Sequence, residues 1–412
     1  MIAFHFPPLA GSSGIQRTIA FARHLPRFGW EPLVLTAHPR AYERVSNDQL
    51  MDVPSSATVE RAFALDSARH LAILGRYPVF TARPDRWVTW WLGAVPKGLE
   101  MIREYRPHAI WSTYPIATAH MIGHTLQRHS GLPWIADFRD PMAQDGYPAD
   151  PKTWQSFRKI EERALRGASF SVFVTPGAER TYRERYPDVP GARIAIIENG
   201  YEEESFTRLA TSDKGPLVPG TFTLIHSGIV YPSERDPTQL FQALRLMFDQ
   251  GDLKPGELRL RLRAPAHEAL LAKLIDDRRV AEIVELVPAI PYRDALQEMM
   301  RADGLLVLQA SNCNDQIPAK VYEYLRCRRP ILALTDPAGD TAGLLRRTGI
   351  DSIARLDSAG EIALALRRFL DEVKARKTPL PDDVFVTGAS RLNRTRELAG
   401  LLDRLPVSGS AG

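Results

Sequence analysis

Cysteine is scarce in this chain, which has only Cys313 and Cys327 among its 412 residues. Two cysteines cannot build a disulfide framework or a cysteine-rich metal site, and they suit a protein that folds in a reducing compartment. Apolar runs of about 18 residues or more are missing, which excludes a transmembrane helix. The N-terminus lacks a basic stretch followed by an apolar one, so no signal peptide is expected. Internal repeats and low-complexity tracts are absent as well.

A large excess of one charge is also lacking, since 53 basic residues stand against 49 acidic ones and leave a net charge of +4. The pI near 9.0 permits attraction to an acidic membrane surface or a phosphorylated substrate without requiring either, and we expect no nucleic-acid partner. Hydrophobic residues make up 44% and charged residues 25%, as in ordinary soluble globular proteins. At 412 residues the chain exceeds the usual size of one core, so two domains are expected.

Short apolar segments alternate with amphipathic ones along the chain, and this alternation predicts parallel α/β sheets. The strands expected in the first half are residues 1–6, 32–36, 108–112, 134–137, 171–175 and 194–197. Those expected in the second half are residues 222–226, 258–263, 283–287, 304–309, 331–334 and 352–355. Helices are expected between most of them, the first over residues 15–25 and the last over about 389–405.

A segment rich in glycine and proline, residues 214–220, is typical of a linker between domains. The sequence therefore predicts an N-terminal Rossmann-like domain over residues 1–213 and a C-terminal one over residues 221–385. Residues 386–412 are left for a final helix and tail. A cleft between two such domains is the expected place for ligands.

The most informative stretch is residues 315–329, where a polar loop leads into a short helix before a buried strand. The start of a helix favours phosphate through its free N–H groups and its dipole, and Lys320 adds a charge in the first turn. Glu323, one turn later, can accept two hydrogen bonds from a ribose diol. The alternative is an ordinary amphipathic helix with Val321 and Leu325 facing inward and the two charged residues in solvent.

This stretch resembles the nucleotide-sugar site of retaining, family-4-type glycosyltransferases of the GT-B fold, in particular their bacterial polysaccharide branch. The resemblance rests on Pro318-Ala319-Lys320-Val321-Tyr322-Glu323-Tyr324-Leu325 before the strand that starts at Pro330. It implies that Pro318, Lys320, Tyr322 and Glu323 bind the donor. It further implies that the first of two acids, here Asp315 in place of the usual Glu, contacts the transferred sugar. The backbone of residues 288–292 would meet the base.

The opening loop, residues 6–17, lies between the first expected strand and the first helix. Small residues let the backbone approach a ligand, and the helix start favours anions. The family pattern is paired prolines, a glycine-rich turn and an arginine in the first helical turn. The residues that fit it or stand within it are Pro7, Pro8, Gly11, Ser12, Ser13, Gly14 and Arg17. A structural turn with a surface arginine is the alternative.

The run Asp137-Phe138-Arg139-Asp140-Pro141 follows an expected strand at the edge where open α/β sheets bind ligands. Two carboxylates and an arginine in so short a run indicate a site, and similar sequences carry the run near the acceptor. The alternative is that Arg139 pairs with Asp137 or Asp140 to stiffen the loop. A histidine that many relatives have near this place is missing.

The second half opens with a loop that mirrors the first. Gly228 permits close backbone approach, and Arg235 can bind a diphosphate bidentately, as a glycine and a downstream basic residue do in the family. Arg235 could instead pair with Glu234 or Asp236, and His226 is interpreted as a strand-end residue. Asn199-Gly200 predicts a tight turn at the entrance to the second domain.

Trp87, Trp90 and Trp91 allow two interpretations. Tryptophan favours membrane interfaces, but offsets of three and four residues also suit a helix packed into a core. Core packing is the interpretation we adopt.

The sequence thus predicts a GT-B glycosyltransferase that moves a sugar from a nucleotide-diphosphate donor, with UDP favoured, to an acceptor hydroxyl with retention. The acceptor would be a glycan, a lipid-linked molecule or a small molecule in polysaccharide or glycoconjugate synthesis. Arg235, Lys320 and Asp315 are the expected catalytic residues, and no cofactor or obligatory metal is implied. A cytoplasmic location, with room for peripheral contact to the inner membrane face, is expected. Two alternatives stay open: a sugar-nucleotide epimerase of the same fold, and an inactive homologue that acts as a binding protein.

Overall fold

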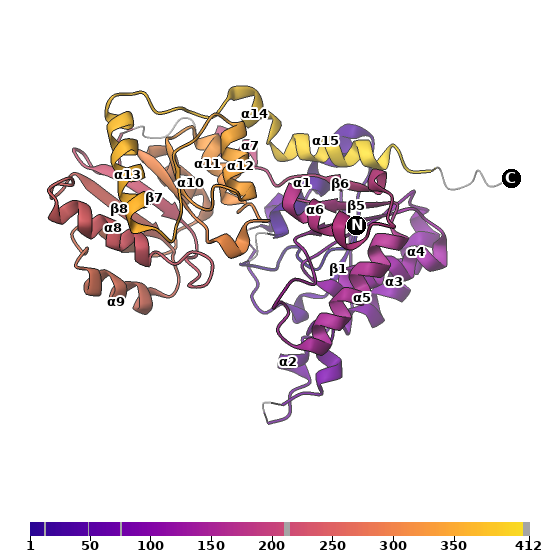
Figure 1. The fold of residues 1–412 in the computed structure, drawn as a ribbon. Helices are drawn as coiled ribbons and strands as arrows, with labels where there is room; N and C mark the ends of the chain where they lie inside the picture. Colours follow the sequence, from indigo (N-terminus) through magenta and orange to yellow (C-terminus); the bar gives the residue numbers. More distant parts are fainter. Residues whose placement is uncertain (12–13, 48, 75, 210–214, 407–412) are drawn as a thin grey trace. The chain divides into compact units, whose positions relative to one another are not determined.

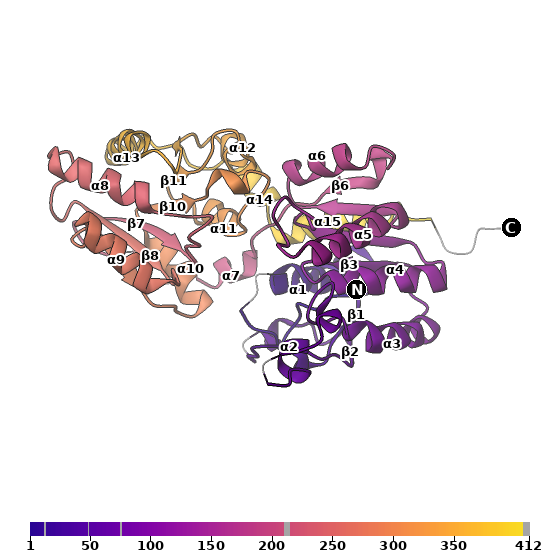
Figure 2. The same cartoon turned by 60° about the horizontal axis from the view of Figure 1, so that its bottom comes forward.

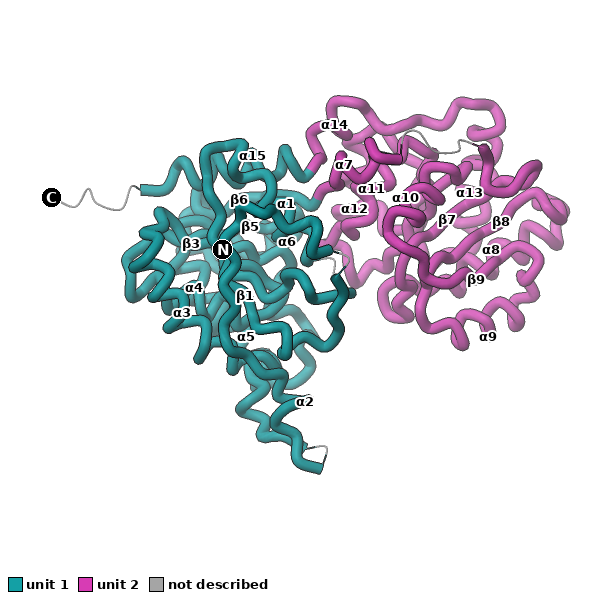
Figure 3. The backbone as a smooth tube through the Cα atoms, turned by 180° about the vertical axis from the view of Figure 1, so that it is seen from behind, with its two compact units in different colours: residues 1–199, 391–412 teal, residues 200–390 magenta. Residues whose placement is uncertain are grey.

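The computed structural model describes residues 1–11, 14–47, 49–74, 76–209 and 215–406 (Figure 1). It contains two compact units: unit 1 holds residues 1–199 with 391–412, and unit 2 holds residues 200–390 (Figure 3). Parts of the sequence predictions lie outside the described ranges, namely Ser12 and Ser13 of the opening loop, residues 210–213 at the end of the expected first domain, Lys214 of the linker, and residues 407–412 of the expected tail.

The described part of unit 1 is built on a parallel sheet. Its strands are β1 Leu33–Ala37, β2 Thr58–Ala62, β3 Ile110–Thr113, β4 Trp134–Arg139, β5 Phe170–Phe173 and β6 Ile194–Ile196. Ile2 bridges to both Leu35 and Ser112, and so it joins the β1–β2 pair to the β3–β4–β5–β6 ladder. The strand expected over residues 1–6 is therefore reduced to this bridge, and β2 was not predicted.

Helices cover both faces of this sheet. They are α1 Gly14–His24, α2 Ser67–His70, α3 Trp90–Tyr105, α4 Ala117–Ser130, α5 Pro151–Gly167, α6 Pro176–Arg185 and α15 Arg391–Leu402 (Figure 1). Asp150 caps α5 and Thr175 caps α6, each followed by a proline at the first helical position. A side-chain acceptor followed by proline is the expected start of a helix, because the first N–H groups have no partner within it.

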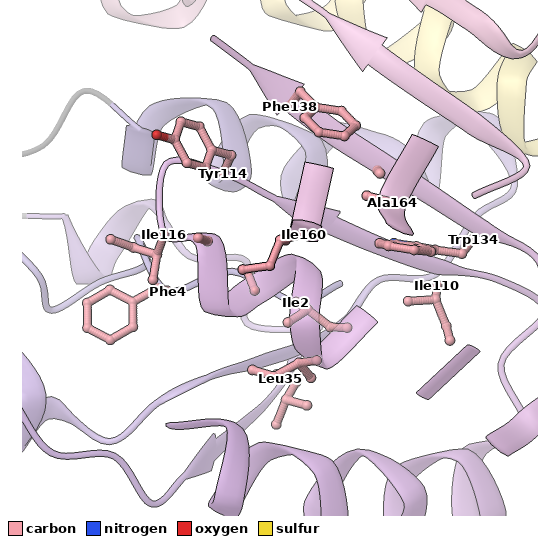
Figure 4. Packing of buried hydrophobic residues seen from close by; sticks show 14 of the residues in the cluster. Ile2, Phe4, Leu35, Ile110, Tyr114, Ile116, Trp134, Phe138, Ile160 and Ala164 are labelled. Carbon is pink, nitrogen blue, oxygen red and sulfur yellow. The ribbon is translucent and has the colours of Figure 1, made fainter. Parts of the chain in front are cut away.

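Two hydrophobic clusters hold unit 1 together. The larger packs the inner faces of helices α3, α4 and α5 against the sheet, and Figure 4 shows part of it around Leu35, Trp134 and Ile160. The smaller packs α1 and α15 against the opposite face. The last helix therefore returns to the first unit, as the fold class predicted, and it covers a face that would otherwise expose apolar side chains.

The three neighbouring tryptophans belong to the larger cluster. Trp90 is fully buried, and Trp87 and Trp91 pack against the cluster from its rim. The indole of Trp87 donates to the carbonyl oxygen of Ala41 at 3.1 Å, and that of Trp91 donates to Thr125 at 3.0 Å. The core interpretation of these residues is confirmed.

Unit 2 is a second parallel sheet with the strand order β12-β11-β10-β7-β8-β9 among its described residues. The strands are β7 Phe222–Ser227, β8 Leu258–Arg263, β9 Val284–Val287, β10 Gly304–Leu308, β11 Ile331–Leu334 and β12 Ile353–Ala354. The helices are α7 Glu203–Thr207, α8 Thr238–Asp249, α9 Glu268–Arg278, α10 Tyr292–Arg301, α11 Lys320–Cys327, α12 Asp340–Arg347, α13 Ala359–Lys374 and α14 Asp383–Gly388. Helices α8, α9 and α13 belong to one cluster, and α10, α11 and α12 belong to another (Figure 2).

The boundary between the units differs from the expected one. Residues 200–209 pack with unit 2, because Tyr201, Phe206 and Leu209 are buried in its cluster with α11 and α12. The prediction gave this segment to the first domain, since its linker signal lies further along, at residues 214–220. Within the described residues of either unit, no helix has the length and apolar character needed to cross a bilayer.

Candidate functional site

The start of helix α11 is fixed against the carboxyl end of β7. Val321 and Leu325 are fully buried and anchor the helix to the core of unit 2. The Tyr324 hydroxyl accepts a hydrogen bond from the backbone N–H of Ser227 at 2.9 Å, which ties the helix to the last residue of β7. This packing places Lys320, the first residue of the helix, over the loop that follows β7.

Lys320 meets two residues of that loop. Its amine lies 3.0 Å from Nε2 of His226, and the Nζ atom lies 3.0 Å from the position that a Cβ would take on Gly228. Gly228 has φ +110°, which a side chain rarely tolerates, so both backbone conformation and space require glycine here. A glycine is therefore needed at position 228 to make room for the Lys320 side chain. The expected approach of the Gly228 backbone to a ligand stays a prediction.

His226 is buried and holds a neutral ring. Its Nδ1 donates to the carbonyl oxygen of Leu306 at 2.9 Å, which leaves the lone pair of Nε2 to accept from Lys320. Burial, and next the charge of Lys320, hold the pKa of His226 well below its usual value. The residue interpreted from sequence as a strand end is therefore the partner that orients the lysine.

Arg235 is the second cation at this edge. Its guanidinium donates to the carbonyl oxygen of Ile229 at 2.6 Å and lies over the ring of Tyr231, 5.2 Å from the centroid. Asp236, one of the two acids proposed as alternative partners, instead accepts from the N–H and hydroxyl of Thr238 at the start of α8. Arg235 is thus held across the loop by a carbonyl and a ring.

The site concentrates positive charge in a partly buried place. Burial lowers the pKa of Lys320 well below its usual value, the charge of Arg235 lowers it further, and Glu323 acts in the opposite direction. Two cations that raise each other's free energy are stabilised when an anion binds between them. A diphosphate supplies several oxygens for such contacts.

Glu323 already has a partner of its own. Its carboxylate accepts from the hydroxyl of Tyr292, the first residue of α10, at 2.7 Å. Arg263 holds the loop before Tyr292 in place. It donates to the carbonyl oxygen of Pro288 at 2.5 Å and pairs with Glu298. The carboxylate expected to bind ribose and the loop expected to meet the base therefore lie side by side.

Other predicted donor residues have different surroundings. Asp315 is exposed and follows the short turn Ser311–Cys313, and Pro318 stands at the turn into α11. Tyr322, expected to bind the donor, is fully buried in the core of unit 2. Helical geometry turns residue 322 inward with Val321 and Leu325, so its side chain packs in the core, and its contact with the donor stays a prediction.

In unit 1, Arg17 and Asp137 form a buried ion pair. Arg17 donates from Nε at 3.0 Å and from Nη2 at 2.9 Å to the two oxygens of Asp137, which also accepts from Thr113. The Asp137 side chain is fully buried and Arg17 is 6% exposed. These two side chains therefore neutralise each other beneath the loop, and their contact with an acceptor stays a prediction. Arg17 also donates to the backbone of Glu198.

Arg139 and Asp140 remain at the edge of this sheet. Arg139 has φ +61° at a register shift between β4 and β5, and such strain in a non-glycine residue is typical of functional sites. Its Nε is buried without a hydrogen-bond partner among the described residues. Burial raises the pKa of Asp140, and Arg139 partly offsets that rise.

His5 joins this group and was missed from the sequence. Burial, followed by the charge of Arg139, lowers its pKa to about 3, so its imidazole is neutral. The signal was a histidine two positions before the paired prolines of the opening loop. Within that loop Gly11 has φ +82° and Gly14 begins α1, so the described glycines serve a tight turn and a helix start.

Asn199 ends unit 1, but residues 197–200 form no tight turn, so the turn expected at Asn199-Gly200 is wrong. Its carbonyl oxygen accepts from Arg394 of α15 at 3.3 Å, and the same arginine pairs with Glu198 at 2.8 Å. Glu198 and Asn199 thus connect the segment after the last strand of unit 1 to its last helix.

The chain matches a family model over residues 13–200, described as a glycosyl transferase 4-like domain. No curated protein matches the sequence. Solved structures match over nearly the whole length. HepE of Anabaena in complex with UDP and glucose is 14% identical, with a TM-score of 0.66, over 98% of this chain and 99% of its own.

Two further solved structures are similar over nearly the whole chain. The lipopolysaccharide outer core galactosyltransferase WaaB is 10% identical, with a TM-score of 0.58 and 98% of each chain covered. A putative UDP-N-acetylglucosamine 2-epimerase from Listeria monocytogenes is 12% identical, with a TM-score of 0.58, over 97% of this chain and 95% of its own. At these identities the likeness shows the fold, which confirms the predicted GT-B class.

Proposed function

We propose, on the premise that residues 13–200 form a family-4-type glycosyltransferase domain within a GT-B fold, that this chain transfers a sugar from UDP to an acceptor hydroxyl. The observation that carries the proposal is the meeting of Lys320, His226 and Arg235 at the carboxyl edge of β7. Glu323 stands one helical turn away, where a ribose next to the diphosphate would lie.

The donor is assigned to unit 2. Lys320 and Arg235 bind the diphosphate, Glu323 binds the ribose diol, and Asp315 lies on the exposed loop that would reach the sugar. Uracil is favoured because HepE, which shares the fold, is described with UDP. The anomeric carbon–oxygen bond breaks, and its electrons remain on the departing diphosphate. The acceptor oxygen forms the new bond and loses its proton.

The cations act on the leaving group. Charge grows on the diphosphate as the bond to the sugar breaks, so groups that are already positioned stabilise the transition state more than the bound donor. The neutral ring of His226 fixes the direction of the Lys320 amine without competing for the anion. Retention of configuration is the outcome that the family resemblance favours.

The acceptor is assigned to unit 1. Arg139 offers a buried Nε with no partner in the described structure, and Asp140 and the neutral His5 provide polar groups nearby. Arg17 and Asp137 support this edge from below. A glycan or lipid-linked acceptor in surface polysaccharide or glycoconjugate synthesis is proposed, in keeping with the described role of WaaB in lipopolysaccharide.

The test is incubation of the purified chain with UDP-sugars, after a thermal-shift comparison of UDP, GDP, ADP and TDP. Binding of the correct nucleotide raises the melting temperature by mass action. Transferase activity releases UDP, whereas an epimerase, the second candidate because the Listeria protein shares this fold, converts the sugar and keeps UDP attached. Binding without either reaction indicates an inactive homologue, and the absence of any nucleotide shift contradicts the donor site.

Glu323→Gln is expected to weaken UDP binding by about tenfold or more, because hydrogen bonds to charged groups contribute about 1.5–3 kcal/mol. Isothermal calorimetry measures the change. Tyr292→Phe removes only the hydroxyl that contacts Glu323, so it should give a smaller loss in the same direction. Glu268→Gln, at an exposed position of α9, serves as the control. Wild-type affinity in Glu323→Gln would refute the ribose assignment.

Transfer is expected to proceed at an unchanged rate in excess EDTA. Lys320 and Arg235 supply the positive charge that a magnesium ion supplies elsewhere. No group of three or more His, Cys, Asp or Glu suited to a metal occurs in the described ranges. The assay compares EDTA with added magnesium and manganese. Loss of activity in EDTA, restored by either ion, would overturn this expectation and draw attention to Asp140.

A further inference from the structure

Unit 1 carries a folded arch that ends in exposed apolar side chains. Its described residues, 67–74 and 76–84, include α2, a backbone bridge between Ile73 and Arg76, and the short helix Val79–Ala82. Figures 1 and 3 show the α2 region extending away from the sheet of unit 1. We define the apolar tip as Ile73, Leu74, Tyr77, Val79 and Phe80.

The base of the arch is well anchored. Asp66 is fully buried, accepts from Arg86 Nε at 2.8 Å and caps α2 through the N–H of Ala68 at 3.1 Å. The N–H of Ser67 donates to the carbonyl oxygen of Arg86 at 2.8 Å. The base of the arch is therefore held by an ion pair between the buried Asp66 and the partly exposed Arg86.

Two described residues near the end of the arch are linked through their backbones. The backbones of Ile73 and Arg76 exchange hydrogen bonds of 2.7 and 3.0 Å. Yet the side chains there face solvent: Leu74 is 99% exposed, Ile73 78%, Phe80 76% and Val79 64%. A cluster of large, exposed apolar residues on an ordered element marks an interaction surface.

The charge around the apolar tip identifies the partner. From residue 67 to residue 84 the sequence has three arginines and one histidine but no aspartate or glutamate. Arg76 is exposed at the tip, while Arg69 and His70 are exposed on α2, where Arg69 donates to the carbonyl oxygen of Tyr42 and the His70 ring contacts the backbone of Asp66. Arg83 pairs with Asp150. Apolar side chains on a projecting arch with an exposed basic border suit insertion into the headgroup region of an anionic bilayer. Tyr77 adds an aromatic ring of the kind enriched at that depth.

We propose that the apolar tip inserts into the surface of an anionic lipid bilayer and that the exposed basic residues beside it contact the lipid headgroups. The surface differs from the tryptophans considered from the sequence, which pack into the core. It does not depend on the proposed function, because the binding needs neither donor nor acceptor.

The test is co-sedimentation of the full chain with vesicles of phosphatidylcholine, alone or mixed with phosphatidylglycerol, without any nucleotide sugar. Wild type should pellet with the anionic vesicles, and less so as salt rises, because salt screens charges between exposed groups. The triple variant Ile73→Ser, Leu74→Ser and Phe80→Ser should lower the partition coefficient by about tenfold or more. The matched control, Leu364→Ser with Val384→Ser, changes apolar residues of unit 2 that are 73% and 81% exposed, and it should bind as wild type does.

A second measurement reports insertion itself. Leu74→Cys can be labelled selectively with a polarity-sensitive dye, because Cys313 and Cys327 are both buried. Its emission should shift to the blue when anionic vesicles are added, and the same dye on Leu364→Cys should not respond.

Three results would overturn the proposal: wild type that stays in the supernatant, a triple variant that pellets like wild type, or a Leu74 label that does not respond. Light scattering tests the alternative that the apolar tip binds a second copy of the chain. A wild-type dimer that the triple variant dissociates, without vesicle binding, would assign the tip to a second copy of the chain and would equally overturn the lipid assignment.

Discussion

Lys320→Ala and Arg235→Ala are each expected to slow sugar transfer by about 10²–10³-fold, the usual loss when one positioned transition-state donor is removed. The reason is geometric as well as electrostatic. Lys320 is directed by a 3.0 Å contact to His226, and Arg235 is held by the carbonyl oxygen of Ile229 and by the ring of Tyr231. Neither cation has to reorganise when negative charge develops on the diphosphate.

The measurement is the rate of UDP release at saturating donor, together with calorimetry on uridine and on UDP. Both variants should bind uridine as wild type does and lose affinity only for UDP. Lys273→Ala, which removes an exposed lysine from α9, is the matched control. Wild-type rates in both variants would place the diphosphate elsewhere in the protein.

Proton uptake provides a second readout on Lys320. In the free protein burial and Arg235 lower its pKa, which disfavours the charged form. A bound diphosphate favours the charged form and raises that pKa. UDP binding should therefore take up protons at pH values where the amine is partly neutral, which calorimetry in two buffers of different ionisation enthalpy detects. Lys320→Ala should abolish this uptake.

Much of the fold could be predicted because the signals are local. The bounds of β8 and β11 match the expected ones, since β8 alternates leucine with arginine and β11 is a short apolar run. By contrast, β2 was missed because Thr58–Ala62 is a partly exposed edge strand whose sequence contains a glutamate and an arginine. The first strand was overestimated because only Ile2 pairs with both of its neighbours.

The sequence predicted which residues form the site better than it predicted which residues they contact. Gly228, Arg235, Lys320 and Glu323 were identified from loops and helix starts. Their partners lie far away in sequence: His226 is 94 residues from Lys320, and Tyr292 is 31 residues from Glu323. Only the packing of β7, α10 and α11 against one another brings these groups together. No local sequence pattern encodes that arrangement.

The same limit explains why the ion pair between Arg17 and Asp137 in unit 1 was not predicted. Local spacing suggested that Arg139 pairs with Asp137 or Asp140, because they are neighbours in sequence. The structure pairs Asp137 with Arg17, 120 residues away, because both lie under the carboxyl edge of the sheet. Arg139, with φ +61°, is directed toward the carbonyl oxygen of Tyr114.

Asp137→Ala is expected to lower the free energy of unfolding of unit 1 by about 3–5 kcal/mol, because removal of one partner leaves the other charge buried and unpaired. Arg17 would lose both of its side-chain acceptors, and Thr113 would lose one. Urea unfolding can follow unit 1 alone, because all seven tryptophans lie between residues 30 and 154. Asp145→Ala, at an exposed carboxylate eight positions later, should leave the midpoint unchanged.

A double variant distinguishes two reasons for lost stability: the cost of burying an unpaired charge, and the loss of the ion pair itself. Replacing both partners with apolar residues, Arg17→Met with Asp137→Leu, removes two buried charges together. Such replacements are often neutral, so this variant should recover most of the stability that Asp137→Ala loses. If it unfolds as early as Asp137→Ala, the carboxylate stabilises unit 1 through its contact with Thr113. If Asp137→Ala unfolds at the wild-type midpoint, the ion pair contributes nothing to the fold, and a direct role for Asp137 at the acceptor becomes the better explanation.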